Sequence, residues 1–130
     1  MDTPRSPFPK RLAAGCLLVT AAAAAQAESS AWTSFDYSLA AGAATMMAVD
    51  WAQTRYAARN PTRFAERNPI MGRHPSTGEV DKYFALSSLL TIGMTYILPR
   101  TERRLFLGGV LVVETGAVAN NYRIGVKVDF

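Results

Sequence analysis

Apolar residues in this chain fall into long blocks separated by short polar segments. After the N-terminal region, the blocks cover about residues 39–54, 83–98 and 105–119. Polar or small residues recur inside each block at helical spacing, which indicates helices carrying one polar stripe each. The pattern therefore predicts an all-α bundle of three helices with these stripes turned inward. Close helix contacts are expected at the glycines of the blocks, namely Gly93, Gly108, Gly109 and Gly116.

Start and stop signals give the helix boundaries. Capping boxes of the form [ST]-x-x-[DE] begin at Thr33 and Ser76, and prolines follow the first two blocks. These signals predict helices over about residues 33–59, 76–98 and 102–120. A shorter helix is predicted over 61–67, and the alternating tail 123–130 suits a short strand or an extended interfacial arm.

The first 27 residues have the three parts of a secretory signal. A basic start is followed by an apolar run over 12–25 and by Ala25-Gln26-Ala27, an A-x-A cleavage site. The alternative is an uncleaved signal anchor, which would add a fourth helix. Residues 28–130 then form a single membrane-embedded helical domain.

The composition favours a membrane. Of the 130 residues, 49% are hydrophobic and 18% are charged, fewer charged residues than in most soluble chains. The net charge of +4 is best explained by basic loops beside apolar helices, since no nucleic-acid-binding motif is present. We therefore expect a transmembrane bundle in the bacterial inner membrane. Its expected partners are membrane lipids together with other proteins or further copies of the chain, and nucleic acid is not expected to bind. A secreted periplasmic helical domain is the alternative, because the apolar runs of the last two helices are short enough for buried core helices.

Two carboxylates interrupt the apolar blocks, Asp50 and Glu114. An ionisable group in hydrocarbon costs about 2.5–3.5 kcal/mol or more, so such a group is a functional candidate. Glu114 is either a titrating proton or cation site or a protonated acid bonded to a hydroxyl of the second helix. Asp50 is expected nearer the cytoplasmic end of its helix, where its carboxylate is either solvated or paired with Arg55. The polar residues that share the predicted seam form a candidate intramembrane site: Asp50, Gln53, Thr54, Glu114 and Asn121.

The loop between the first two blocks holds a second candidate site, made of Glu66, Asn68 and His74. These side chains could meet Asp50 at the membrane boundary, whereas the structural alternative is that Asn68 and Pro69 only redirect the chain. Basic residues recur every four positions before this loop and suit anionic headgroups: Arg59, Arg63 and Arg67.

Three motifs resemble those of a family of small uncharacterised bacterial and phage-associated membrane proteins. They are Asp50-x-x-Gln53-Thr54, then Glu66-x-Asn68-Pro69-Ile70-Met71-Gly72, then a late Glu114 and Asn121. The resemblance covers about residues 33–128. It implies several membrane helices and no assigned activity.

Catalytic motifs of the common hydrolase, metalloprotease and nucleotide-binding types are absent from the sequence. One cysteine and one histidine are too few for a Cys/His zinc site or a bis-His haem, and only a carboxylate-rich metal site stays open. We predict no metal, no cofactor and no catalytic residue. The predicted function is that of an accessory or structural partner in a membrane complex. The alternatives are a small transporter or channel component titrating at Glu114 and, third, an intramembrane hydrolase. The hydrolase needs Asp50 and Glu114 together, whereas the predicted topology places them at different depths.

Overall fold

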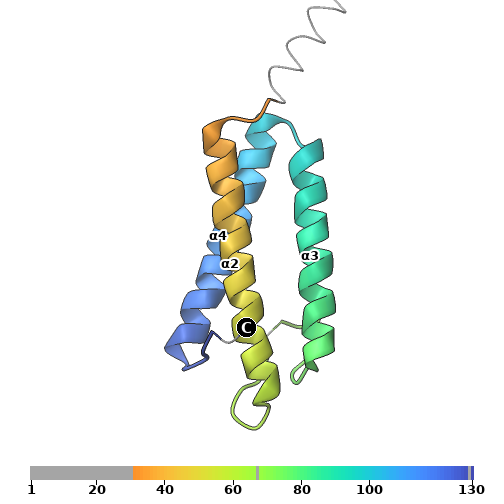
Figure 1. The fold of residues 1–130 in the computed structure, drawn as a ribbon, viewed down its shortest axis with the longest axis vertical. Helices are drawn as coiled ribbons and strands as arrows, with labels where there is room; N and C mark the ends of the chain where they lie inside the picture. Colours follow the sequence, from red (N-terminus) through yellow and green to blue (C-terminus); the bar gives the residue numbers. More distant parts are fainter. Residues whose placement is uncertain (1–30, 67, 129) are drawn as a thin grey trace, which may run out of the picture. The chain divides into compact units, whose positions relative to one another are not determined.

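Three helices make up the regular structure in the described part of the chain. The computed structural model describes residues 31–66, 68–128 and 130, and Trp32–Phe130 form one compact unit. The helices are α2 (Ser34–Arg59), α3 (Thr77–Ile97) and α4 (Arg100–Arg123). α2 and α4 run in one direction and α3 runs in the other (Figure 1). The predicted all-α three-helix bundle is confirmed, while the predicted signal at 1–27 lies outside the described residues.

Both predicted capping boxes are present. The Thr33 hydroxyl accepts a hydrogen bond from the Asp36 amide at 3.3 Å, and the Asp36 carboxylate accepts one from the Thr33 amide at 2.8 Å. Ser76 and Glu79 repeat this arrangement at the start of α3. Each box satisfies amide groups that have no partner within the helix, which is why these two starts are readable from sequence.

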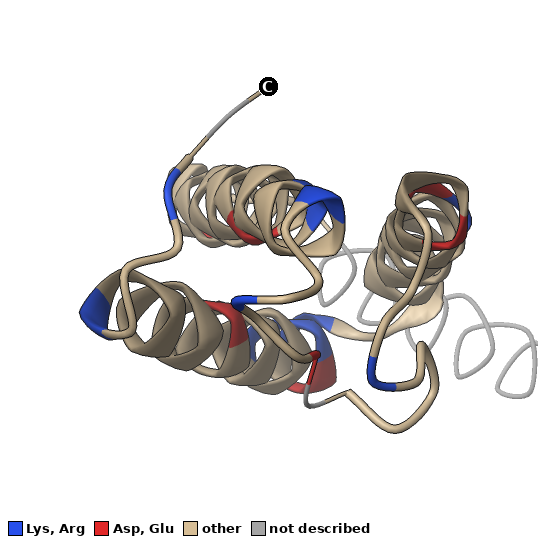
Figure 2. Cartoon of the chain, turned by 90° about the horizontal axis from the view of Figure 1, so that it is seen from below, with Lys and Arg blue, Asp and Glu red and all other residues tan. Residues whose placement is uncertain are grey.

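The three helices are unequally packed. α2 packs most extensively against α4, less against α3, and α3 touches α4 least. Seen from below, α2 and α4 lie close together and α3 stands apart (Figure 2). Gly42 of α2 faces α4, since a Cβ there would lie 3.6 Å from Leu111, in ordinary van der Waals contact. The predicted contacts at four other glycines are wrong, since a Cβ at any of them would meet nothing within 4 Å: Gly93, Gly108, Gly109 and Gly116.

The connection between α2 and α3 is a folded loop. The prediction of a short helix at 61–67 is wrong for its described residues, which form turns followed by irregular backbone. Phe64 anchors the loop, being 8% exposed and 5.9 Å from the Tyr56 ring. The Glu66 amide donates to the Arg73 carbonyl at 2.9 Å. Tertiary burial of one ring and a long-range backbone bond stabilise this loop, and neither leaves a periodic signal.

The chain after α4 returns to α2. Gly125 has a φ of 86°, a left-handed turn that glycine adopts without strain. Val126 is then buried at 3% exposure, and the Phe130 ring lies 6.4 Å from Trp51. The tail is therefore an arm packed on the bundle, and its described residues form no strand.

The membrane-spanning part of the fold prediction finds no support in the structure. Within the described ranges, no helix combines the length and the hydropathy needed to cross a membrane. Charged or strongly polar residues limit each apolar stretch: Asp50 in α2, Asp81 and Lys82 in α3, and Glu114 in α4.

Candidate functional site

A pocket of about 360 Å³ lies between α2 and α4 and is closed by the 64–71 loop and the arm after α4. We call it the acidic pocket. The residues with polar side-chain groups that line it are Asp50, Thr54, Glu66, Asn68, Tyr83, Glu114, Asn120 and Asn121. It thus brings together most of both candidate sites predicted from sequence.

Three elements each contribute one carboxylate to the acidic pocket. Asp50 comes from α2, Glu66 from the loop and Glu114 from α4, and none of the lining residues is Lys, Arg or His. Charge repulsion in this pocket is therefore not balanced by a cation among its lining side chains.

Hydrogen bonds hold two of the three carboxylates. The Asn121 side-chain amide donates to Asp50 Oδ1 at 2.8 Å, which ties α4 to α2. The Asn68 backbone amide donates to Glu66 Oε1 at 2.9 Å. By contrast, Glu114 Oε2 is buried and has no hydrogen-bond partner among the described residues. An ionised carboxylate in that position is costly, so its protonated form is favoured.

Burial raises the pKa of two carboxyl groups in the acidic pocket. The pKa of Asp50 rises to about 7, first because the carboxyl is desolvated and then because Glu114 and Glu66 repel its charge. The hydrogen bond from Asn121 opposes this rise. Burial also raises the pKa of Glu114. Near neutral pH, Asp50 therefore exchanges a proton with solvent while facing a second acid.

The relation between the two central carboxylates differs from the prediction. Asp50 and Glu114 line one pocket, so the expectation that they lie at different depths is wrong. The reason is that α2 and α4 begin at the same end of the bundle and run in the same direction. Asp50 is also not paired with Arg55, which forms its ion pair with Asp81 at 3.5 Å. The second-helix hydroxyls proposed as Glu114 partners line a different hollow, between α2 and α3: Ser88, Thr91 and Tyr96.

Two predicted residues lie outside the acidic pocket. Gln53 is 1% exposed and does not line it. His74 is exposed and borders a small recess next to Glu66 and Arg73, so its imidazole does not join Asp50. No group of three or more His, Cys, Asp or Glu side chains among the residues described is placed to hold a metal ion.

A buried ion cluster at the opposite end of α2 was missed by the sequence analysis. Asp36 is 0% exposed and accepts a hydrogen bond from Arg104 Nε at 2.7 Å. Arg103 Nη2 lies 3.8 Å from the same carboxylate, and its guanidinium lies 4.8 Å from the centre of the Trp32 ring. The hydrogen bond from Arg104, with those from Thr33, holds the pKa of Asp36 far below its ordinary value. The capping box was a readable signal for this position, but its arginine partners were not.

Comparison with family models, with curated proteins and with solved structures finds no match to this chain.

Proposed function

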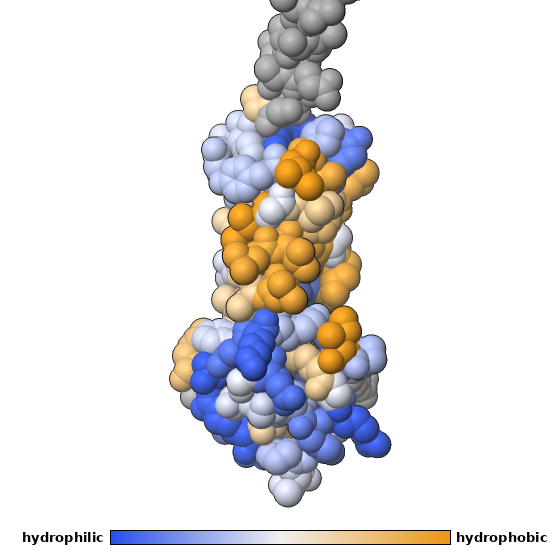
Figure 3. Space-filling model, turned by 90° about the vertical axis from the view of Figure 1, so that its right-hand side faces the viewer, coloured by the Kyte–Doolittle hydropathy of each residue, from blue (hydrophilic) through white to orange (hydrophobic). Residues whose placement is uncertain are grey.

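We propose that this protein is a membrane-bound accessory or structural partner in a bacterial inner-membrane complex. One observation carries the proposal, a band of exposed large apolar side chains on the outer faces of α3 and α4. We call this band the apolar belt; it consists of Leu86, Leu89, Leu90, Ile97, Leu105, Val112 and Val113. Figure 3 shows hydrophobic side chains gathered over the middle of one face and hydrophilic ones at its lower end.

The belt is too exposed for an isolated helical bundle in water. Leu89 is 67% exposed and Val112 is 72% exposed. Soluble monomers rarely expose contiguous apolar patches larger than a few hundred Å². Residues 83–97 of α3 and 105–113 of α4 contain no charged side chain, whereas charged residues flank both segments: Asp81 and Lys82 precede the first, Arg100 follows it, Arg104 precedes the second and Glu114 follows it. This distribution supports contact between the belt and the apolar phase of a membrane.

The proposed contact belongs to the bundle as a whole. The charge-free part of α3 is 15 residues long, about 22 Å, which is shorter than a hydrocarbon core of about 30 Å. No described helix has the length and hydropathy needed to span a membrane. The apolar belt is therefore proposed to be immersed in the membrane without any single helix crossing the bilayer. The acidic pocket adjoins the belt, since Val113 belongs to the belt and also lines the pocket.

Alkaline extraction of membranes from cells that produce the full chain tests this proposal. The wild-type protein should stay with the membrane pellet. The double variant Leu89→Asp/Val112→Asp should move mostly to the supernatant, because each charge adds a cost of about 2.5–3.5 kcal/mol in hydrocarbon. The matched control Thr62→Asp/Thr101→Asp adds the same charge at exposed positions outside the belt and should stay in the pellet.

Two results would overturn the membrane proposal. Recovery of wild-type protein in the supernatant as a monomer would show that the belt needs no apolar partner. Recovery there as an oligomer that Leu89→Asp dissociates would assign the belt to self-association, as expected for a periplasmic helical domain.

A second candidate function is supported by the acidic pocket. A proton-coupled transporter or channel component needs a group that titrates near neutral pH, and the pKa of Asp50 at about 7 meets that need. The test is flux through proteoliposomes as a function of pH. Glu114→Gln should shift that dependence if the pocket conducts protons, and unchanged flux would leave the pocket a structural role.

A further inference from the structure

An open recess of about 460 Å³ lies between the loop after α2 and the arm after α4. We call it the arginine recess. Two cations line it, Arg63 and Arg73, together with one carboxylate, Glu66. The rest of its lining is apolar and consists of Phe64, Ala65 and Ile124. No cation lines the acidic pocket on the other side of this loop, so the two hollows differ in charge.

The fold of the loop brings the two arginines together. Gly72 has a φ of 76°, a left-handed conformation that glycine adopts without strain. The chain turns back at this point, and the Arg73 carbonyl accepts a hydrogen bond from the Glu66 amide at 2.9 Å. Arg63 and Arg73 lie on either side of this turn and therefore line the same recess.

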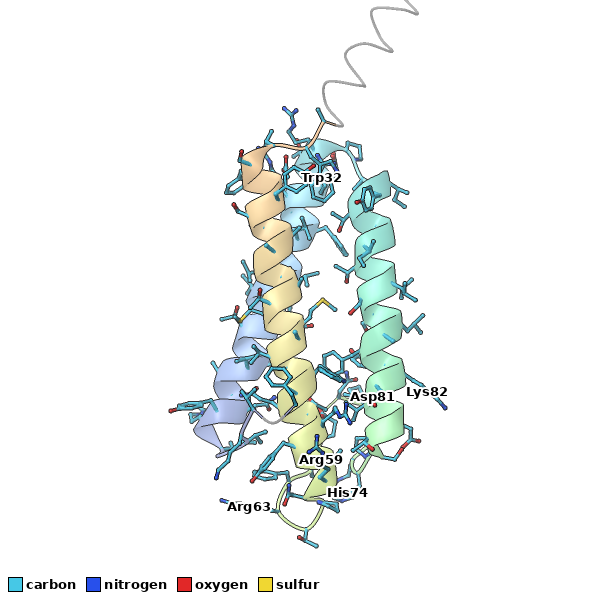
Figure 4. The ribbon with its side chains drawn as sticks, viewed as in Figure 1. Trp32, Arg59, Arg63, His74, Asp81 and Lys82 are labelled. Atoms are coloured by element: carbon cyan, nitrogen blue, oxygen red, sulfur yellow. The ribbon has the colours of Figure 1, made fainter. Side chains whose placement is uncertain are left out.

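Arg63 is held in place by the residues around it. Its guanidinium carbon lies 5.3 Å from the centre of the Phe64 ring, and Phe64 is itself buried. A Cβ built on Gly125 would lie 3.8 Å from Arg63 Nη2, so the guanidinium also lies beside the backbone of the arm. Figure 4 shows Arg63 at the lower end of the bundle, opposite the end that carries Trp32. A side chain supported in this way loses less conformational entropy when a ligand binds.

Neither arginine of the recess is neutralised by the bundle. Within the described chain, no carboxylate forms an ion pair with Arg63 or Arg73, and the ion pairs of the structure are made by arginines of α2 and α4. Glu66 contributes one negative charge to the lining, and its Oε1 accepts the hydrogen bond from the Asn68 amide. Two guanidinium groups against one carboxylate leave the recess with an excess of positive charge.

The surroundings of the recess are basic as well. Charged residues at this end of the bundle are visible from below in Figure 2. The exposed cations there are Arg59, Arg63, Arg73, Lys82, Arg123 and Lys127. Among the residues that the structure describes at this end, the exposed carboxylate is Glu79, which accepts two hydrogen bonds from Ser76 at the start of α3. The summed field of these cations raises the concentration of anions around the recess.

The number and kind of donors select the anion. A guanidinium presents a planar fork of N–H groups that matches the oxygens of a carboxylate or a phosphate. A carboxylate has two oxygens and a single charge, which one guanidinium satisfies. The phosphate of a monoester has three acceptor oxygens and a charge of about −1.5 to −2 near pH 7, enough for both arginines. The apolar side chains of Phe64 and Ile124 then face the carbon skeleton that carries the phosphate.

We propose that the arginine recess binds the phosphate group of a phosphate monoester, with Arg63 and Arg73 each donating hydrogen bonds to its oxygens. Two sources present this group, a soluble polyol phosphate and the headgroup of phosphatidic acid. The inference goes beyond the proposed function, because the recess lies outside the apolar belt and its charge does not depend on the membrane location.

Isothermal titration calorimetry of the full chain in a nonionic detergent tests the site and separates the two sources. The probes are glycerol 3-phosphate and dihexanoyl phosphatidic acid, at one fixed ionic strength because salt screens such contacts. At least one probe should bind saturably. An affinity for phosphatidic acid that is higher by about tenfold or more would assign the lipid headgroup, and any other order would assign the soluble ester. Glycerate, with a carboxylate in place of the phosphate, should bind about tenfold more weakly than the tighter probe.

Charge removal provides the second arm. Arg63→Gln/Arg73→Gln should weaken binding of the tighter probe by about tenfold or more, because its charge-assisted hydrogen bonds are lost. Arg63→Lys/Arg73→Lys keeps both charges but removes the planar forks, and it should weaken binding about threefold. The matched control Lys82→Gln/Lys127→Gln removes the same charge from exposed positions outside the recess, and its effect should stay below about twofold. Far-UV circular dichroism and the urea midpoint show that each variant keeps the fold.

Three results would overturn the inference. The first is the absence of saturable binding by both probes. The second is an equal loss of affinity in the two glutamine variants, which would reduce the effect to the general field of the basic end. The third is binding of glycerate as tight as that of the phosphate probes. Alkaline extraction tests the membrane proposal separately, so release of the protein into the supernatant would overturn that proposal and leave the titrations of the recess unaffected.

Discussion

The acidic pocket predicts an unusual dependence of stability on pH at Asp50. Its carboxyl has an ordinary pKa of 3.8 and a pKa of about 7 in the folded chain. Because the folded state favours the protonated form, ionisation of Asp50 destabilises the fold. The penalty is absent below pH 3.8, grows as the pH rises toward 7, and is constant above that.

The size of this penalty follows from the pKa difference. At about 1.4 kcal/mol per pKa unit, the full difference corresponds to about 4 kcal/mol. Asp50 is only partly shielded from solvent, so screening reduces the expected effect to about 2–3 kcal/mol. Asp50→Asn removes the charge but keeps an oxygen that can accept the bond from Asn121. We expect this variant to match wild type near pH 4 and to be about 2–3 kcal/mol more stable at pH 8.

Urea denaturation of the full chain between pH 4 and pH 8, followed by tryptophan fluorescence, measures this difference. Glu102→Gln is a suitable control because it removes one negative charge at an exposed position, and its effect should stay within about 0.5 kcal/mol. A stability gain in Asp50→Asn that is the same at both ends of the pH range would refute the reasoning. So would a variant less stable than wild type at pH 8.

Three further predictions concern the same bundle. In Glu114→Gln, the pH at which Asp50 ionises should fall, because one source of repulsion is gone; a carbon-detected NMR titration of the Asp50 carboxyl measures it. Asp36→Asn should cost about 3–5 kcal/mol in urea denaturation at pH 7, since it removes the buried carboxylate that the buried Arg103 and the half-buried Arg104 share, and a loss below 1 kcal/mol would contradict a stabilising ion cluster. Leu107→Ala should cost about 2–5 kcal/mol because the side chain is 1% exposed, whereas Leu105→Ala, at 74% exposed, should change thermal or urea stability by less than 1 kcal/mol.

Local signals account for what the sequence predicted correctly. The capping boxes at Thr33 and Ser76 act within one turn of helix, so three or four residues are enough to identify them. The last helix is longer than predicted, Arg100–Arg123 against 102–120, because Pro99 itself is the N-cap residue and no side-chain cap marks the start. Contacts between distant segments were not readable. The pairing of Asp36 with Arg104 joins residues that are 68 positions apart, and no local pattern around either residue indicates it.

The position of Glu114 relative to Asp50 shows why the depth of a residue along the bundle was harder to predict than its membership of the polar seam. The sequence indicated that both acids belong to one polar seam, and both line the acidic pocket. Their depths were judged from the apolar stretches around them, but the relevant distance is the number of residues from each helix start. Asp50 lies 16 residues after the start of α2, and Glu114 lies 14 residues after the start of α4. At 1.5 Å per residue these distances differ by only about 3 Å. Because two connections return the chain to the same end of the bundle, α2 and α4 are parallel, and repulsion between the two carboxylates follows from the topology.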